Sequence, residues 1–249
     1  MEEKVEGFLD SILTALLNLV YSKDKKTERY LVLLIVIGFI LRLIAALHLD
    51  VLADDMIYTS QSAGIASAKI LSTHSNPPLF FYLTDFAYKI FGYTTFASRF
   101  WTLIFGTLLI PLIFLITKKF FDKRVALAAA FFVTFSNFLI RMTFTEQSLV
   151  VFFLSFFAIY IGIFYLEQKK FSYLIFSAIL FGLAILTKYN APFFIFSFLI
   201  FSTYYLKSRN EKVFTSKNIK NLFVFLLIIF IFSLPFLAFN YFLYKDKGI

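Results

Sequence analysis

The organisation of this chain is decided by one polar stretch, residues 49–99, which begins LDVLADDMIYTS (49–60) and continues through HSNPPLFFY (74–82). It is the longest polar interruption in an otherwise apolar sequence, and it carries an acidic pair, Asp54 and Asp55. Apolar runs lie on both sides of it. A connection of this length is rarely a plain linker. We therefore expect it to hold a carboxylate pair at the surface of a membrane.

The composition excludes a water-soluble globule. Hydrophobic residues make up 60% of the 249 residues and charged residues 16%, against about 45–50% and about 25% in soluble domains. The apolar runs are continuous and do not alternate with polar residues. They predict an all-α, polytopic transmembrane helical bundle rather than a β-barrel. The formal charge of +9 is expected to reflect cationic loops and not nucleic-acid binding.

Residues 1–29 are predicted to form a separate N-terminal segment. Between Val5 and Val20 the apolar residues recur at the i, i+3, i+4 spacing of an amphipathic helix. This helix lies either in the cytoplasmic interface of the membrane or against the protein's own loops. Four acidic residues occupy the region that is cationic in a signal peptide, so a signal peptide is not expected.

Seven membrane spans are predicted in a single membrane domain, residues 30–249. Their bounds are 30–48, 100–117, 125–142, 148–166, 173–187, 191–206 and 222–244. The fifth and sixth are short, because about 16 helical residues cover roughly 24 Å of a hydrocarbon core that is roughly 30 Å thick. A re-entrant hairpin is the alternative for these two, and either version returns the chain to the same side.

The basic residues set the predicted orientation. They gather before the first span and in alternate loops, which are cytoplasmic by the positive-inside rule. The N-terminus is then cytoplasmic, and residues 49–99 face the exterior of what we expect to be a prokaryotic cell membrane. Within this exterior loop the pattern predicts two short amphipathic helices, one running to Lys69 and one ending at Gly92. A turn at 73–78 joins them, and both lie flat on the membrane.

The acidic pair and one intramembrane cation are candidates for chemistry. Asp54 and Asp55 are either a solvated pair that caps a helix or a general base that takes the proton of an acceptor hydroxyl. Arg42 falls inside the first span, where an isolated charge costs about 2.5–3.5 kcal/mol on insertion scales. It should therefore face a partner or a wet cavity, with snorkelling or a structural ion pair as the alternatives.

Further charged residues are predicted at the same membrane level. Arg99, Arg141, Glu146 and Lys188 all stand at the exterior ends of spans. Taken singly, each is an interfacial anchor. Taken together with the acidic pair, they would line one exterior pocket in which cations stabilise the charge on a departing phosphate.

Two more residues of the loop are candidates with open roles. His74 precedes a double proline that would hold its direction; it could bind phosphate or a metal, or simply pack. Tyr58 lies one helical turn beyond Asp54 and could contact the same substrate or belong to an aromatic belt. A divalent metal is left open, because Asp54, Asp55, Glu146 and His74 could hold one but their spacing does not demand it.

These features resemble the C-type polytopic membrane glycosyltransferases, which include the dolichyl-phosphate-mannose protein mannosyltransferases and the aminoarabinose lipid A transferases. The matching segments are residues 41–43, 54–58, 74–82, 98–99, 141–146 and 182–188. None is specific alone. Their order relative to the predicted spans carries the resemblance, which extends over residues 30–245.

The resemblance implies an inverting glycosyltransferase, specifically a hexosyltransferase that moves a sugar from a polyprenyl (dolichyl)-phosphate carrier to an acceptor hydroxyl. It also implies that Asp54 is the base with Asp55 in support, and that Arg99, Arg141 and Lys188 contact phosphate. The pair is Asp-Asp where Asp-Glu is commoner, so which carboxylate is the base stays open. The chain has seven predicted spans where relatives have more, which is expected of a minimal form, a fragment, or half of a two-chain enzyme.

Two other classes of function are kept as alternatives. One is a non-catalytic subunit that binds a polyprenyl phosphate or partners a second membrane subunit. The other is a small transporter, which the sequence disfavours because no two spans share the Gly/Pro-interrupted pattern of a midplane site. The expected partners are the lipid-linked donor and membrane lipid, whereas the donor sugar and the acceptor are not specified.

Overall fold

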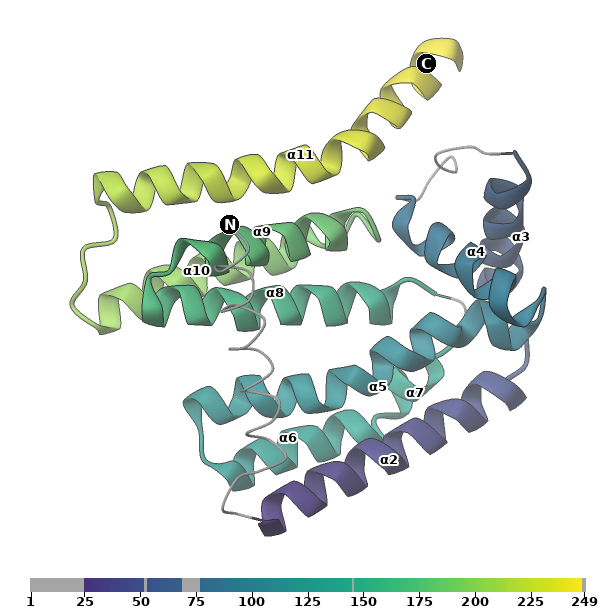
Figure 1. Cartoon of the computed structure of the whole chain (residues 1–249), viewed down its shortest axis with the longest axis horizontal. Coiled ribbons are helices and arrows are strands. Elements are labelled where there is room, and N and C mark those ends of the chain that lie inside the picture. The colour runs from purple at the N-terminus through teal and green to yellow at the C-terminus, as the bar shows by residue number, and fades with distance from the viewer. Residues whose placement is uncertain (1–24, 52, 69–76, 145, 248–249) are drawn as a thin grey trace.

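The computed structural model describes residues 25–51, 53–68, 77–144 and 146–247, and in these ranges every regular element is a helix (Figure 1). The predicted N-terminal amphipathic helix lies outside them. The helices are α2 (Lys25–His48), α3 (Ala53–Ala68), α4 (Leu79–Phe91), α5 (Thr95–Phe120), α6 (Lys123–Phe135), α7 (Asn137–Arg141), α8 (Ser148–Gln168), α9 (Phe171–Ile185), α10 (Pro192–Ser208) and α11 (Ser216–Lys247). The predicted all-α class is confirmed.

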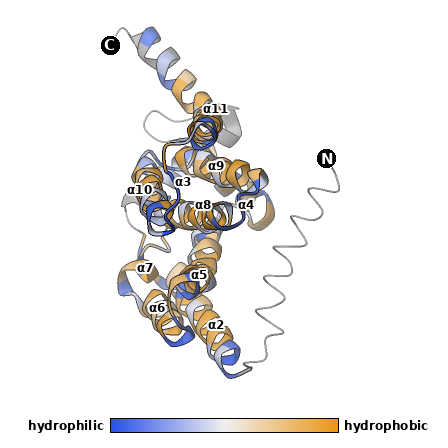
Figure 2. Ribbon diagram, turned by 90° about the vertical axis from the view of Figure 1, so that its left-hand side faces the viewer, coloured by the Kyte–Doolittle hydropathy of each residue, from blue (hydrophilic) through white to orange (hydrophobic). Residues whose placement is uncertain are grey.

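Within the described ranges, four helices are long and apolar enough to cross a membrane: Lys26–His48 within α2, α5, α8, and Ser216–Ala238 within α11. Apolar residues dominate the outer helices α2 and α11 as well as the central α8 (Figure 2). Large apolar side chains on these outer helices, such as Val32, Leu33 and Phe223, are exposed. Such surfaces suit lipid rather than water. The chain is therefore an integral membrane protein, and the count of seven spans stays a prediction.

The segment predicted as the third span, residues 125–142, is divided into two helices, α6 and α7. The break falls at Ser136, whose backbone is extended (φ −62°, ψ 110°) between α6 and α7. The Ser136 hydroxyl accepts a hydrogen bond from the Leu139 N–H at 3.3 Å and so caps α7. A local capping residue inside an apolar run thus ended the helix.

The long helices pack side by side. Helices α2, α5 and α6 contact one another, α5 joins α8, α8 packs on α9, and α9 packs on α11 (Figure 1). The main core lies between α5, α8, α9 and the first half of α11. It is filled by large side chains from each of them: Leu109, Val150, Ile161, Phe181, Phe225 and Ile229.

Helices α3 and α4 lie at one end of this bundle (Figure 1), which confirms the two helices predicted within residues 49–99. Gly92 ends α4 with a φ of 71°, a conformation that favours glycine. The Leu79 N–H donates to the Leu186 carbonyl at 2.9 Å and so ties the start of α4 to the end of α9. Helix α4 buries Phe80 and Phe81 but leaves Phe86 exposed, so only part of its apolar stripe faces the protein.

Candidate active site

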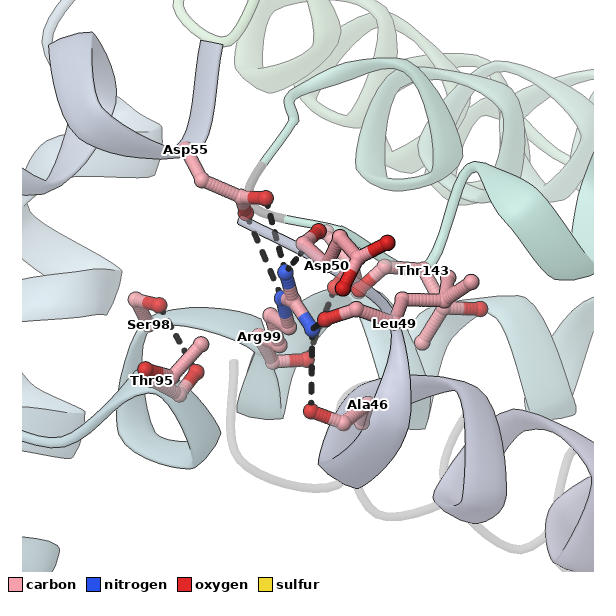
Figure 3. Close-up of polar contacts among 9 residues, drawn as sticks. Ala46, Leu49, Asp50, Asp55, Thr95, Ser98, Arg99 and Thr143 are labelled. Atoms are coloured by element: carbon pink, nitrogen blue, oxygen red, sulfur yellow. Dashed lines mark hydrogen bonds and ion pairs between the residues drawn. The ribbon is translucent and has the colours of Figure 1, made fainter. Parts of the chain in front are cut away.

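The acidic loop is joined to the bundle by a buried ion pair between Arg99 and Asp55 (Figure 3). Arg99 stands in the second turn of α5, and Asp55 in the first turn of α3. The guanidinium donates from Nε to Asp55 Oδ1 at 3.3 Å and from Nη2 to Asp55 Oδ2 at 2.8 Å. Arg99 is fully buried, and Asp55 is 2% exposed. The bidentate geometry fixes the direction of the carboxylate.

The same guanidinium also closes the end of α2. Its remaining N–H groups donate to the carbonyls of Ala46 (3.2 Å), Leu49 (3.0 Å) and Asp50 (3.2 Å). Carbonyls at the end of a helix lack partners within the helix, and a cation there also opposes the helix dipole. A guanidinium has five N–H donors, and all five are used. The structure therefore favours a positioning role for Arg99 over the predicted contact with phosphate.

A second, partly buried ion pair joins Glu146 and Lys188 at the start of α8. Glu146 Oε1 accepts from Lys188 Nζ, and Glu146 Oε2 accepts from the Ser148 backbone N–H at 2.6 Å, which caps α8. Lys188 Nζ also donates to Ser148 Oγ at 3.0 Å. An ammonium has three N–H donors. Lys188 thus keeps one donor for a ligand, unlike Arg99.

Both ion pairs lie at the same end of the bundle. The Thr102 hydroxyl, one turn beyond Arg99, donates to the Thr143 carbonyl at 2.8 Å, three residues before Glu146. On the other side, the bond from Leu79 to Leu186 places the start of α4 beside the segment that carries Lys188. Residues far apart in the sequence are therefore gathered at one end of the bundle, whereas the single exterior pocket expected for them stays a prediction.

Arg42 does not join this group. Its side chain is fully buried and donates to the carbonyls of Gly38 (3.1 Å) and Val133 (2.9 Å). Val133 lies in the last turn of α6, where a carbonyl has no partner within its helix. The space comes partly from Gly106, because a Cβ there would lie 3.1 Å from Arg42 Nε. These contacts favour the structural alternative for Arg42 over substrate binding.

The other predicted residues fall in different surroundings. Arg141 ends α7 and is exposed, and its side chain makes no hydrogen bond or ion pair within the described ranges. Tyr58 is half-buried and packs its ring against Phe80 and Phe81, with centroids 6.2 and 6.1 Å away. The side chain of Asp54 and the whole of His74 lie outside the described part, so their roles stay predictions.

The metal alternative also stays open. Among the side chains that the structure describes, no three His, Asp or Glu residues come together as metal ligands would. Two of the four residues named for this role, Asp54 and His74, are not among those side chains.

Several buried polar groups at this end were not singled out from the sequence. Both amide atoms of the Gln147 side chain, the Thr143 hydroxyl and the side-chain oxygen Oδ1 of Asn190 are buried without a hydrogen-bond partner among the described residues. Tyr88 of α4 is buried beside Thr59 and Ser98, and burial raises the pKa of its phenol above the ordinary value. Gln147 and Asn190 could have been found from the sequence, because they lie next to Glu146 and close to Lys188 in the chain. No pattern in the sequence pointed to Tyr88.

Comparison with known proteins gives the class. The structure matches the crystal structure of the Archaeoglobus fulgidus oligosaccharyltransferase in the apo form with a TM-score of 0.65 and 22% identity. It also matches the archaeal oligosaccharyltransferase AglB from A. fulgidus, in complex with an inhibitory peptide and a dolichol-phosphate, with a TM-score of 0.64 and 21% identity. Each match covers 88% of this chain and 30% of that one. The fold is that of the C-type membrane glycosyltransferases.

The family follows from the sequence itself. The model of the dolichyl-phosphate-mannose-protein mannosyltransferase family matches residues 75–239, well over half of the chain. The chain belongs to that family. The matched region contains Arg99, Glu146 and Lys188 and begins after the acidic pair. No curated protein is significantly similar in sequence.

Proposed function

We propose that this chain is the membrane module of a glycosyltransferase that moves a sugar from a polyprenyl (dolichyl)-phosphate carrier to an acceptor hydroxyl at the exterior face. Family membership and fold support the class. The observation that carries the proposal is the buried ion pair between Arg99 and Asp55, because it anchors the acidic pair at the end of the bundle. The basic residues of the loops at the opposite end support an exterior position for this site.

Asp54 is the base in this proposal. Both oxygens of Asp55 already accept N–H bonds from Arg99, so the neighbouring carboxylate is the better proton acceptor. The acceptor oxygen attacks C1 of the sugar from the face opposite the phosphate, and its proton passes to Asp54. The bond between C1 and the phosphate oxygen breaks, and the carrier phosphate leaves with the electron pair. Inversion at C1 follows from this single displacement.

Cations near the departing phosphate complete the chemistry. The free N–H of Lys188 and the exposed guanidinium of Arg141 are proposed to neutralise the phosphate as it leaves. Asp55 and Arg99 position the loop and do not contact the reacting atoms. The hexosyl specificity implied by the resemblance belongs to this proposal as well.

The test is release of polyprenyl phosphate from dolichyl-phosphate-linked hexoses by membranes that contain the full chain. Asp54→Asn should lower the rate at least about 100-fold, within the range ordinary for a lost general base. Asp50→Asn is the matched control, because Asp50 is exposed at the same end and only its backbone carbonyl contacts Arg99. Equal rates for Asp54→Asn and the wild type would remove Asp54 from the mechanism.

The second candidate is a carrier-binding subunit that needs a second chain for turnover. The chain spans 30% of the length of the solved oligosaccharyltransferases that it matches. Dolichyl phosphate would then bind the purified chain, and release would require an added membrane fraction. Turnover by the purified chain with a simple acceptor would exclude this alternative.

A further inference from the structure

A cavity of about 180 Å³ lies at the opposite end of the bundle from Asp55. It is lined by the last turns of α8, by residues 198–206 of α10, by the first turn of α9, by the loop between α10 and α11, and by the first three turns of α11, which meet at the left of Figure 1. Its walls are mainly apolar and include Leu166, Leu174, Phe198, Val213 and Phe225.

The size and chemistry of this cavity suit a hydrocarbon chain. An engineered cavity of about 150 Å³ lined by apolar side chains binds benzene. The polar groups on the wall are used within the protein, since Asn221 Nδ2 donates to Tyr165 Oη at 2.6 Å and Ser202 Oγ to the Phe198 carbonyl at 2.7 Å. Nothing in these bonds calls for a polar ligand inside the cavity.

The back wall of the cavity is held in place. The Phe198 ring packs directly on Gly162 of α8, where an added Cβ would clash with it. The rings of Phe181 and Phe225 pack against Phe198 from the other sides, with centroids 5.8 and 6.1 Å away. The cavity is therefore preformed by interlocked side chains.

The segments that surround the cavity carry an excess of basic residues, which we place at its rim. Phe214, in the loop between α10 and α11, lines the cavity and is 85% exposed. The two acidic residues on the surrounding segments are already paired: Glu167 with Lys119 at 2.6 Å and Glu211 with Lys169 at 2.7 Å. The remaining basic residues of these segments are exposed: Lys170, Lys207, Arg209, Lys212, Lys217 and Lys220.

We propose that this cavity binds one acyl chain of an anionic phospholipid, whose phosphate lies among the cations of the rim. An apolar pocket with a cationic mouth is complementary to such a lipid in both shape and charge. Within the described contacts, the main packing partner of α11 is α9. A lipid held here adds a bridge from α11 to α8 and α10. The site lies far from the acidic pair and does not depend on the proposed transfer reaction.

The first test measures lipid retention by native mass spectrometry. The full chain is purified in detergent with equal amounts of phosphatidylglycerol and phosphatidylcholine that carry the same acyl chains. The wild type should retain phosphatidylglycerol at least tenfold over phosphatidylcholine, and excess inorganic phosphate should not displace it. Ser202→Phe, which fills the cavity, should lower retention at least tenfold.

Ser197→Phe is the matched control. Ser197 lies on the same helix and makes the same kind of bond, to the Phe193 carbonyl at 2.8 Å, but it is exposed and does not line the cavity. It should retain phosphatidylglycerol like the wild type. If Ser202→Phe also retained it fully, the acyl chain would lie elsewhere and the proposal would be overturned.

A second variant tests the rim without touching the core. Lys212→Gln with Lys217→Gln removes two exposed cations and should lower the preference for phosphatidylglycerol roughly tenfold, with phosphatidylcholine retention unchanged. If circular dichroism and size-exclusion chromatography show that Ser202→Phe does not fold, the double lysine variant alone tests the proposal. An unchanged preference, or equal retention of the two lipids by the wild type, would overturn the proposal.

Discussion

Arg99 and Asp55 lie 44 residues apart in the chain, and their side chains form a bidentate ion pair inside the protein. The same guanidinium holds the carbonyls of Ala46, Leu49 and Asp50. One side chain on α5 therefore fixes both the end of α2 and the beginning of α3. Because Asp54 precedes Asp55 directly, the position of the proposed base depends on this one contact.

Arg99→Lys should damage both stability and transfer. An ammonium has three donors on a flexible stem and cannot replace the planar five-donor fork. Breaking a buried pair costs about 3–5 kcal/mol when a charge is left uncompensated. We expect the lysine variant to lose a smaller part of that, seen as a lower thermal unfolding midpoint in detergent, with a parallel fall in transfer rate.

Arg124→Lys is the control for this experiment, since Arg124 is exposed at the start of α6. It should change neither quantity. If Arg99→Lys unfolded at the wild-type temperature while losing affinity for the carrier, Arg99 would contact phosphate after all.

Glu146 should show two separable roles. In Glu146→Gln the amide oxygen can still accept the Ser148 N–H and cap α8, whereas the charge that pairs with Lys188 is gone. In Glu146→Ala the cap is lost as well, at a further cost of about 1 kcal/mol. Thermal unfolding should therefore rank the variants wild type, Gln, Ala. Equal stability of Gln and Ala would show that the cap contributes nothing.

Lys188→Gln should impair transfer more than folding. Lys188 keeps one donor after its bonds to Glu146 and Ser148. Loss of one donor that stabilises a developing negative charge costs about 100-fold in kcat or more. Lys118→Gln, exposed at the other end of α5, serves as the control. A normal kcat in Lys188→Gln would exclude the proposed contact with the departing phosphate.

The sequence predicted the helices well because membranes leave the backbone little choice. A chain in lipid must satisfy its own N–H and C=O groups, so long apolar runs are helices. The Ser136 break was missed because one serine hydroxyl, bonded to the Leu139 N–H, changed the local balance within such a run. The presence of a helix can be predicted from the composition of the segment, whereas the residue at which it ends is set by single side chains.

Partner choice within the candidate site was harder to predict. The predicted spans place Arg99, Glu146 and Lys188 at one membrane level, and in the structure these residues lie at the same end of the bundle. Arg99 uses all its N–H donors on Asp55 and three backbone carbonyls. This choice of partners depends on how α2 and α5 cross in space. The same holds for Arg42, whose bond to the Val133 carbonyl spans 91 residues. The membrane depth of a charged residue can be predicted from the sequence. Its hydrogen-bond partner can be predicted only when the packing of the helices is known.

Arg42→Met tests whether that intramembrane cation is structural. The change keeps much of the side-chain volume but leaves the Val133 carbonyl without a donor at the end of α6. An unsatisfied buried group costs about 1–3 kcal/mol, so the unfolding midpoint should fall while the affinity for dolichyl phosphate stays unchanged. Gly106→Ala should act the same way, because its Cβ would lie 2.9 Å from Leu149 Cδ1 and 3.1 Å from Arg42 Nε. The opposite result would be weaker carrier binding with normal stability in Arg42→Met. It would mean that Arg42 contacts the substrate, because the loss of a purely structural cation cannot weaken binding without also destabilising the fold.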